Sequence, residues 1–216
     1  MCSIIASFNR EKFEELIKLN QHRGNFSFSY TELDTTIGNL PANQIKGYGE
    51  FEKLLINSER HLYKIGHVQA PTNGMIEDSN RIHPIMNGES PNSMLFHNGL
   101  LTPRGVKFLQ HKLQTNETFD TRLLFEAIKE FGYDILDEVE GLFSCLHIRD
   151  GEIFIFRTKH GKLFIDEDMN VSSERFLGSK CIGYNRIYKL DLDKKHIISK
   201  QPFITKRFNF VIKGEL

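Results

Sequence analysis

Hydrophobic and polar residues recur with different periods along the chain, which predicts a mixture of strands and helices. Residues 2–8 form a short apolar run with β-branched side chains that stops at Asn9, so we expect a buried strand and then a turn or a helix N-cap. Apolar residues at helical spacing predict a helix over 10–21, terminated by Gly24. Residues 26–30 alternate aromatic and small polar side chains, which indicates a half-buried strand.

The middle of the chain is predicted to consist of loops interrupted by short elements. We expect loops over 31–49, 69–74 and up to 92, a helix over 50–57, and strands over 62–68 and 93–97. Asn98 and Gly99 follow the last of these strands directly, and this pair of residues favours a tight turn with positive φ.

The second half of the chain is predicted to hold one clear helix and several hairpins. The helix begins at Asp120, interpreted as its N-cap, and ends at Gly132. Asp-Gly and His-Gly pairs between apolar runs are typical of hairpins. Strands are expected over 141–149, 152–158, 162–165, 182–192 and 203–212. Mixed elements with consecutive hairpins favour an α+β layered fold with largely antiparallel sheets, in a single domain spanning 1–216.

The composition narrows the classes of function. The 216 residues carry 28 basic and 28 acidic side chains without blocks of one charge, so neither a membrane nor a nucleic acid is expected as a direct partner. The nine histidines lack the spacings typical of zinc sites, so neither a metal nor a cofactor is expected. Because the sequence shows no secretion signal and no long apolar run, we expect a cytoplasmic protein.

Three cysteines remain to be explained. Cys145 and Cys181 lie in apolar, strand-like runs and are expected to be small buried hydrophobic residues, since a cytoplasmic chain keeps its thiols reduced. Cys2 differs by position, because removal of Met1 would make it the N-terminal residue.

Five short strings stand out between residues 2 and 121. They are Cys2-Ser-Ile-Ile, Gln21-His-Arg-Gly24, His67-Val-Gln-Ala-Pro-Thr-Asn-Gly74, Phe96-His-Asn-Gly-Leu100 and Phe119-Asp-Thr121. In this order they resemble the motifs of class II glutamine amidotransferases, which are N-terminal-nucleophile (Ntn) hydrolases. The region beyond residue 141 matches only in general pattern. The resemblance implies a four-layer αββα sandwich with largely antiparallel sheets.

The resemblance also implies a role for individual residues. Cys2 would attack the side-chain amide of glutamine, and its own α-amino group, with a reference pKa of about 7.7–8.0, would act as the base. The Asn98 side chain and the Gly99 N–H would form the oxyanion hole. Asp120 would bind the α-ammonium group of glutamine. Further substrate-binding candidates are His67, Gln69, Thr72 and Thr121.

One position departs from the family pattern. The family carries an arginine that binds the α-carboxylate of glutamine, and this chain has Gln69 there. A neutral amide cannot offer the charged, bidentate fork of a guanidinium. Three explanations remain open: Arg23 or Arg81 substitutes, a partner completes the site, or the true substrate lacks a free α-carboxylate.

The length implies a partner. Class II family members usually join this domain to one that uses the ammonia, and these 216 residues match the glutaminase part alone. We therefore expect a separate ammonia-accepting synthetase or transferase; the chain is similar to stand-alone versions associated with large bacteriophages. Two rival interpretations are an Ntn-fold acylase that cleaves another amide and a non-catalytic scaffold.

Overall fold

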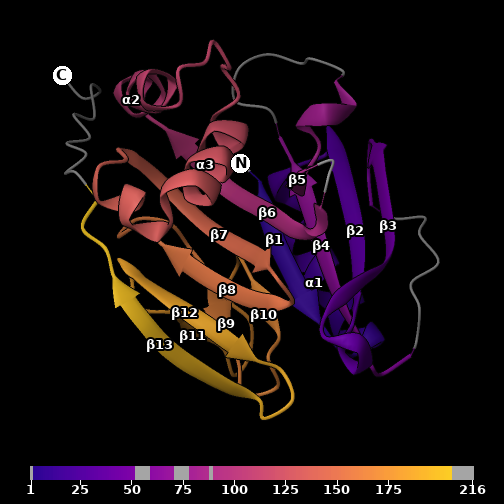
Figure 1. Ribbon diagram of the computed structural model, residues 1–216. Coiled ribbons are helices and arrows are strands. Elements are labelled where there is room, and N and C mark those ends of the chain that lie inside the picture. The colour runs from indigo at the N-terminus through magenta and orange to yellow at the C-terminus, as the bar shows by residue number, and fades with distance from the viewer. Residues whose placement is uncertain (1, 52–58, 71–77, 88–89, 206–216) are drawn as a thin grey trace, which may run out of the picture.

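The computed structural model describes residues 2–51, 59–70, 78–87 and 90–205, which form two β-sheets with helices on both sides (Figure 1). Sheet A has the strand order β11-β9-β10-β1-β4-β2-β3, and sheet B the order β13-β12-β8-β7-β6-β5. Every pair of neighbouring strands is antiparallel.

The elements of the described chain have the following bounds. Sheet A contains β1 (Ser3–Ser7), β2 (Ser27–Asp34), β3 (Leu40–Tyr48), β4 (Leu62–Gln69), β9 (Phe164–Ile165), β10 (Val171–Ser172) and β11 (Lys180–Cys181). Sheet B contains β5 (Ile85–Asn87), β6 (Ser90–Leu101), β7 (Gly141–Arg149), β8 (Glu152–Arg157), β12 (Arg186–Asp191) and β13 (His196–Pro202). The α-helices are α1 (Arg10–Asn20), α2 (Pro103–Leu113) and α3 (Asp120–Phe131), and the 3₁₀ helices are η1 (Gln21–Arg23), η2 (Thr35–Ile37), η3 (Ser79–Arg81) and η4 (Tyr133–Asp137).

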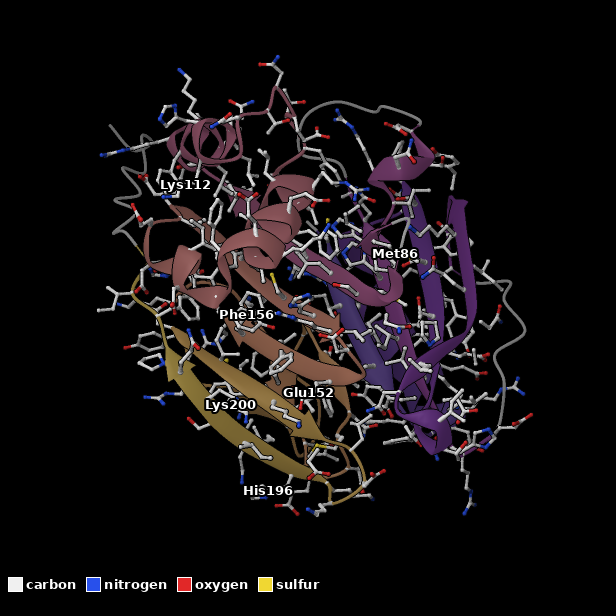
Figure 2. All side chains as sticks on the ribbon, in the orientation of Figure 1. Met86, Lys112, Glu152, Phe156, His196 and Lys200 are labelled. Atoms are coloured by element: carbon white, nitrogen blue, oxygen red, sulfur yellow. The ribbon has the colours of Figure 1, made fainter. Side chains whose placement is uncertain are left out.

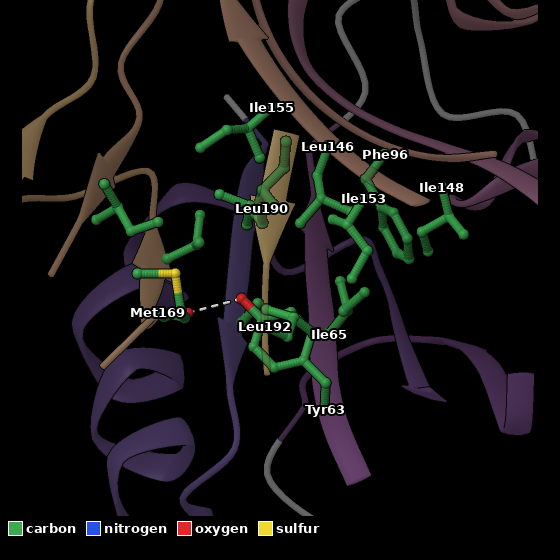
Figure 3. Packing of buried hydrophobic residues seen from close by; sticks show 14 of the residues in the cluster. Tyr63, Ile65, Phe96, Leu146, Ile148, Ile153, Ile155, Met169, Leu190 and Leu192 are labelled. Atoms are coloured by element: carbon green, nitrogen blue, oxygen red, sulfur yellow. Dashed lines mark hydrogen bonds between the residues drawn. The ribbon is translucent and has the colours of Figure 1, made fainter. Parts of the chain in front are cut away.

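Three apolar cores hold four layers together. The central core lies between the sheets, where Ile65 of β4 faces Leu146 of β7, and the Tyr63 hydroxyl donates to the Met169 carbonyl over 2.7 Å (Figure 3). A second core joins α1 to the outer face of sheet A, and a third joins α2 and α3 to the outer face of sheet B (Figure 1). The layer order is therefore αββα, as expected from the resemblance.

Strand β1 illustrates how the sequence encodes this arrangement. Ile4 and Ala6 belong to the central core, whereas Ile5 between them packs in the α1 core. Because side chains alternate across a strand, a strand covered on both faces needs a continuous apolar run, which is what residues 2–8 supply. The predicted cap is confirmed, since the Asn9 side chain accepts from the Lys12 N–H at the start of α1.

The two predicted helices at 10–21 and 120–131 are confirmed within one residue. The interpretation of Asp120 as an N-cap is wrong, because Phe119 occupies the N-cap position without a side-chain bond and Asp120 is the first helical residue. Helix α2 was not anticipated. The predicted helix at 50–57 falls mainly outside the described residues.

The predicted loop over 31–49 is wrong, because β2 continues to Asp34 and β3 follows. Strand β3 is an edge strand whose side chains are mostly half-exposed or exposed, so its sequence shows little periodicity. Its backbone pairing with β2 holds it in place. The loop expected up to residue 92 is interrupted for the same reason by β5, another edge strand.

The predicted tight turn at Asn98 and Gly99 is also wrong. Both residues lie inside β6, opposite Ser144 and Phe143 of β7, although Gly99 has the expected positive φ of 146°. Pairing with a long neighbouring strand outweighs the local turn preference. The hairpin predicted around Asp150 is confirmed. The hairpin predicted at His160 and Gly161 is wrong, because the strands on either side, β8 and β9, belong to different sheets.

The last part of the chain differs most from the expectation. Strands β9 and β12 are shorter than the predicted 162–165 and 182–192, residues 203–205 are not a strand, and the rest of the predicted strand 203–212 lies outside the described residues. Strand β13 was not anticipated, because it is an edge strand with exposed polar side chains such as His196 and Lys200 (Figure 2).

The cysteine expectations are confirmed for one residue of the two. Cys145 is buried in the α3 core, but Cys181 is exposed, since β11 is the edge strand of sheet A. None of the helices in the described ranges is long and apolar enough to cross a membrane. The single-domain assignment and the cytoplasmic location stay predictions.

Candidate active site

The thiol of Cys2 lies at the start of β1, beside the end of β4. Because β1 and β4 are antiparallel with Ser3 opposite Val68, the residues that follow β4 reach Cys2. The Sγ atom donates to the Ala70 carbonyl over 3.7 Å, and the residue is only 8% exposed. Cys2 is therefore largely excluded from solvent, at one end of the central sheets.

The segment Gln21 to Gly24 forms the next wall of this site. The Arg23 Nε donates to the Cys2 carbonyl over 3.1 Å, and its Nη1 forms an ion pair with Glu174. A Cβ atom at Gly24 would lie 2.5 Å from the Gln69 carbonyl carbon, so only glycine allows η1 to approach β4 this closely. The string Gln21-His-Arg-Gly24 thus fixes the backbone of Cys2.

Asn98 of β6 connects sheet B to the start of β1 through Ser173. Its Nδ2 donates to the Ser173 hydroxyl over 3.0 Å, and that hydroxyl also accepts from the Ile4 N–H over 2.9 Å. Ser173 therefore links β6 to β1 across the two sheets. Sequence reasoning did not find Ser173, because nothing local distinguishes it from the serine before it.

Gly99 lies very close to the backbone of the neighbouring strand β7. A Cβ atom there would lie 2.1 Å from the Leu142 carbonyl oxygen and 2.6 Å from the Phe143 Cα. Its φ of 146° is also unfavourable for any other residue. Both facts require glycine beside Asn98.

Asp120 contributes a carboxylate from the start of α3. Its Oδ2 accepts from the Leu101 N–H over 3.1 Å and its Oδ1 from the Thr121 N–H over 2.8 Å. The charge of the Asp120 carboxylate acts on the Cys2 thiol and raises its pKa. These two residues therefore belong to one site.

The acidity of the Cys2 thiol reflects these surroundings. Burial raises its pKa above the usual value, the hydrogen bond to Ala70 lowers it, the Asp120 carboxylate raises it and Arg23 lowers it. The direction is upward because burial is the largest effect. At neutral pH the thiol is therefore protonated and needs a base before it can attack a carbonyl.

Three buried histidines, His67, His83 and His97, are joined by hydrogen bonds through the His97 carbonyl and the Thr121 hydroxyl. The His67 Nε2 donates to the His97 carbonyl over 3.0 Å, while the His97 Nδ1 and the His83 Nε2 lie 2.7 and 3.1 Å from the Thr121 Oγ1. Burial lowers the pKa of His67 to about 3 and that of His83 well below its usual value, and it also lowers the pKa of His97, a shift that the Asp120 carboxylate opposes.

All three rings are consequently neutral at pH 7. The Thr121 hydroxyl can donate to one ring nitrogen and accept from the other, so it joins β6 to the segment before β5. His67 and Thr121, expected as substrate-binding residues, are buried and bonded to interior groups. His83 and His97 were not anticipated as members of this network, because no short motif joins the three histidines.

The remaining predicted residues are placed as follows. Gln69 is buried, and its Oε1 accepts from the Ser27 hydroxyl over 2.8 Å, which turns that oxygen towards β2. Thr72 lies outside the described residues. In the described part of the chain, no cluster of three or more histidine, cysteine or acidic side chains is arranged to hold a metal ion.

A cavity of about 880 Å³ lies at the other end of β1 and contains none of the predicted site residues. It is lined by Phe8, Lys12, Asp166 and Lys195, among others. We place the candidate site at Cys2 because the polar groups converge there, whereas this cavity is a wide depression lined by charges of both signs.

Comparisons with known proteins agree with this fold. No family model and no curated protein matches the chain. Among solved structures, it is similar to the glutamine phosphoribosylpyrophosphate (PRPP) amidotransferase from B. subtilis complexed with ADP and GMP, with a TM-score of 0.66 and 18% identity over 93% of this chain and 49% of that one. It is also similar to a structure described as the allosteric regulatory enzyme of purine biosynthesis, with a TM-score of 0.65 and 17% identity over the same shares.

These similarities concern the fold. The chain has the αββα sandwich of the N-terminal-nucleophile hydrolases, as the sequence resemblance implied. It spans about half the length of the two solved structures, 49% in each case.

Proposed function

We propose that this chain is a class II glutamine amidotransferase whose Cys2, exposed by removal of Met1, hydrolyses the side-chain amide of glutamine. The observation that carries the proposal is the convergence of Cys2, Asn98 and Asp120 from three different elements at the start of β1. The fold of the solved relatives supports the same class of enzyme. The ammonia would pass to a separate synthetase or transferase, in a cytoplasmic protein of the type associated with bacteriophages.

The first step is attack on the amide. The α-amine of the processed Cys2 takes the thiol proton, because its reference pKa of about 7.7–8.0 lies close enough to neutrality for part of the amine to be unprotonated and to act as the base. The sulfur then bonds to the amide carbon, and the carbonyl oxygen becomes an oxyanion. Asn98 uses one amide hydrogen for Ser173, so its second is available to that oxyanion together with the Gly99 N–H.

The second step releases ammonia. The C–N bond breaks as the Cys2 ammonium returns its proton to the leaving nitrogen, which leaves a γ-glutamyl thioester on Sγ. A water molecule, deprotonated by the same amine, attacks the thioester and expels the thiol and glutamate. No histidine is required, which fits the neutral, buried state of His67, His83 and His97.

Substrate binding relies on Asp120. Each carboxylate oxygen accepts one backbone N–H, and a carboxylate offers about four acceptor positions, so an α-ammonium group can still bind. The electrostatic effect of Asp120 on the Cys2 thiol supports binding of the ammonium in the same site.

The test is ammonia release from glutamine by three proteins: the wild type, Cys2→Ser and the matched control Cys181→Ser. Cys181 is an exposed cysteine on the edge strand β11, so its loss should leave ammonia release unchanged, whereas Cys2→Ser should abolish it. A diazo-ketone analogue of glutamine should add its mass to the wild type and the control only. Intact mass should also show that Met1 is gone. Undiminished activity in Cys2→Ser, or an active enzyme that keeps Met1, would refute the mechanism.

A second candidate is an Ntn-fold acylase acting on an amide without an α-carboxylate. Gln69 favours it, since this residue is uncharged and its oxygen is bonded to Ser27. Comparing glutamine with N-acylated amides separates the two candidates. A non-catalytic scaffold would release ammonia from neither and would not react with the diazo-ketone.

A further inference from the structure

Glutamine carries a negatively charged α-carboxylate as well as a positively charged α-ammonium group. If its α-ammonium group binds Asp120, as the proposed function requires, the α-carboxylate is attached to the same carbon and must lie beside the start of α3. A carboxylate held in a partly desolvated site next to Asp120 needs a positively charged partner.

Three nearby basic residues are engaged elsewhere. Arg23 binds the Cys2 carbonyl and Glu174. The Nη1 of Arg122 donates to the carbonyl of Met86, which Figure 2 labels. Lys46 donates to two backbone carbonyls, at 2.9 and 2.7 Å, before β5. Each of these three side chains bonds to at least one backbone carbonyl, so moving it to a substrate would leave that carbonyl without this partner.

Arg81 is placed differently. It ends η3, and its guanidinium lies over the ring of Phe119 with its Cζ 5.5 Å from the ring centroid. Its Nη2 is 3.5 Å from the Thr118 Oγ1, and its Nε is 3.7 Å from the Asp78 Oδ2. Residues 118 and 119 directly precede Asp120, so Arg81 packs on the segment that presents the carboxylate.

These contacts orient Arg81 without using up its donors. A planar guanidinium over an aromatic ring keeps its edge, and therefore its N–H fork, open to an acceptor. The distances to Thr118 and Asp78 are at or beyond the limit of a good hydrogen bond, so a carboxylate can replace them at small cost. The side chain is 31% exposed, enough for a substrate to reach it.

We infer that Arg81 binds the α-carboxylate of the substrate and supplies the positive charge that Gln69 lacks. The two charged groups of a free α-amino acid would then each have a partner: Asp120 would bind the ammonium and Arg81 the carboxylate. The substrate class is accordingly free L-glutamine rather than a peptide-bound or α-amidated glutamine. Arg81 is thus a specificity-determining residue.

The test compares L-glutamine with its α-amide, L-glutaminamide, as substrates of the wild type and Arg81→Gln. Loss of a charge-assisted hydrogen bond should raise the KM for L-glutamine about 10- to 100-fold, with a small change in kcat. The KM for L-glutaminamide should not change, because this substrate has no carboxylate to lose. Arg81→Lys should fall between wild type and Arg81→Gln, since an ammonium keeps the charge but not the fork.

The matched control is Arg10→Gln, which removes one exposed arginine from α1 on the outer face of sheet A. Its KM for both substrates should equal that of the wild type. If Arg81→Gln unfolds, the intermediate KM of Arg81→Lys, at wild-type thermal stability, still decides the question. Equal KM values for L-glutamine in wild type and both Arg81 variants, or equal increases for both substrates, would overturn the inference while the proposed function stands. Absence of ammonia release and of diazo-ketone labelling in the wild type would overturn both.

Discussion

Replacing Gly99 by alanine should separate two strands at the candidate oxyanion hole. The new methyl group would lie 2.1 Å from the Leu142 carbonyl oxygen and 2.6 Å from the Phe143 Cα. Both atoms belong to the backbone of β7 and cannot rotate away as a side chain could. Strand β6 must therefore move away from β7 by more than an ångström, because ordinary contacts to Cβ begin at 3.4 Å.

Two effects set the magnitude of the loss in stability. An alanine at a φ of 146° occupies a region used almost only by glycine, at a cost of about 1–3 kcal/mol. Relieving the backbone clash adds roughly 1–3 kcal/mol, as for other overpacked sites. The sum, about 2–6 kcal/mol, is a large part of the free energy of unfolding of a typical domain, about 5–15 kcal/mol. Displacing the neighbouring oxyanion donors should also lower kcat by about 10²–10³.

Urea unfolding followed by circular dichroism measures the first effect, and ammonia release measures the second. The matched control is Gly132→Ala at the end of α3, where φ is 70° and no atom lies within 4 Å of the added Cβ. This control carries the φ penalty alone, so it should lose about 1–3 kcal/mol and keep full activity. Equal losses in the two variants would refute the steric part of the reasoning, and full activity of Gly99→Ala would refute the role of Gly99 in the site.

Two further predictions concern buried polar groups. Thr121→Val should lower the free energy of unfolding by about 2–4 kcal/mol, because it removes the hydroxyl that bonds to His83 and His97. Thr121→Ser keeps the hydroxyl and should unfold near the wild-type urea concentration. Equal stability of the two variants in urea unfolding would contradict the network. Burial lowers the pKa of Lys46 to about 8 from 10.5, so the unfolded chain binds more protons between these pH values and wild-type stability should rise with pH across that window. The difference in free energy of unfolding between wild type and Lys46→Met should grow in favour of wild type from pH 8 to 10.5, and a flat difference would show that Lys46 is not desolvated.

The pattern of apolar and polar residues predicted those elements whose burial can be read from their own residues. The apolar run of β1, the helical spacing after Asp120 and the two-residue turn at Asp150 and Gly151 each need only neighbouring residues to be read. The five motif strings likewise led to the αββα layers and to Cys2. Edge strands such as β3 and β13 were not predicted, because backbone pairing, rather than side-chain burial, holds them in place.

The tertiary structure alone decided how the site is assembled. Asn98 meets Ser173 across 75 residues of sequence, and Arg81 meets Phe119 from a different element. Asn98 and Gly99 remain in a strand because β7 pairs with them, which no local turn preference could reveal. The sequence by itself therefore determined the nucleophile candidate, its expected helpers and the layers. The partners that orient Asn98, and the position of Arg81 over Phe119 just before Asp120, depend on contacts between distant segments, which periodicity does not encode.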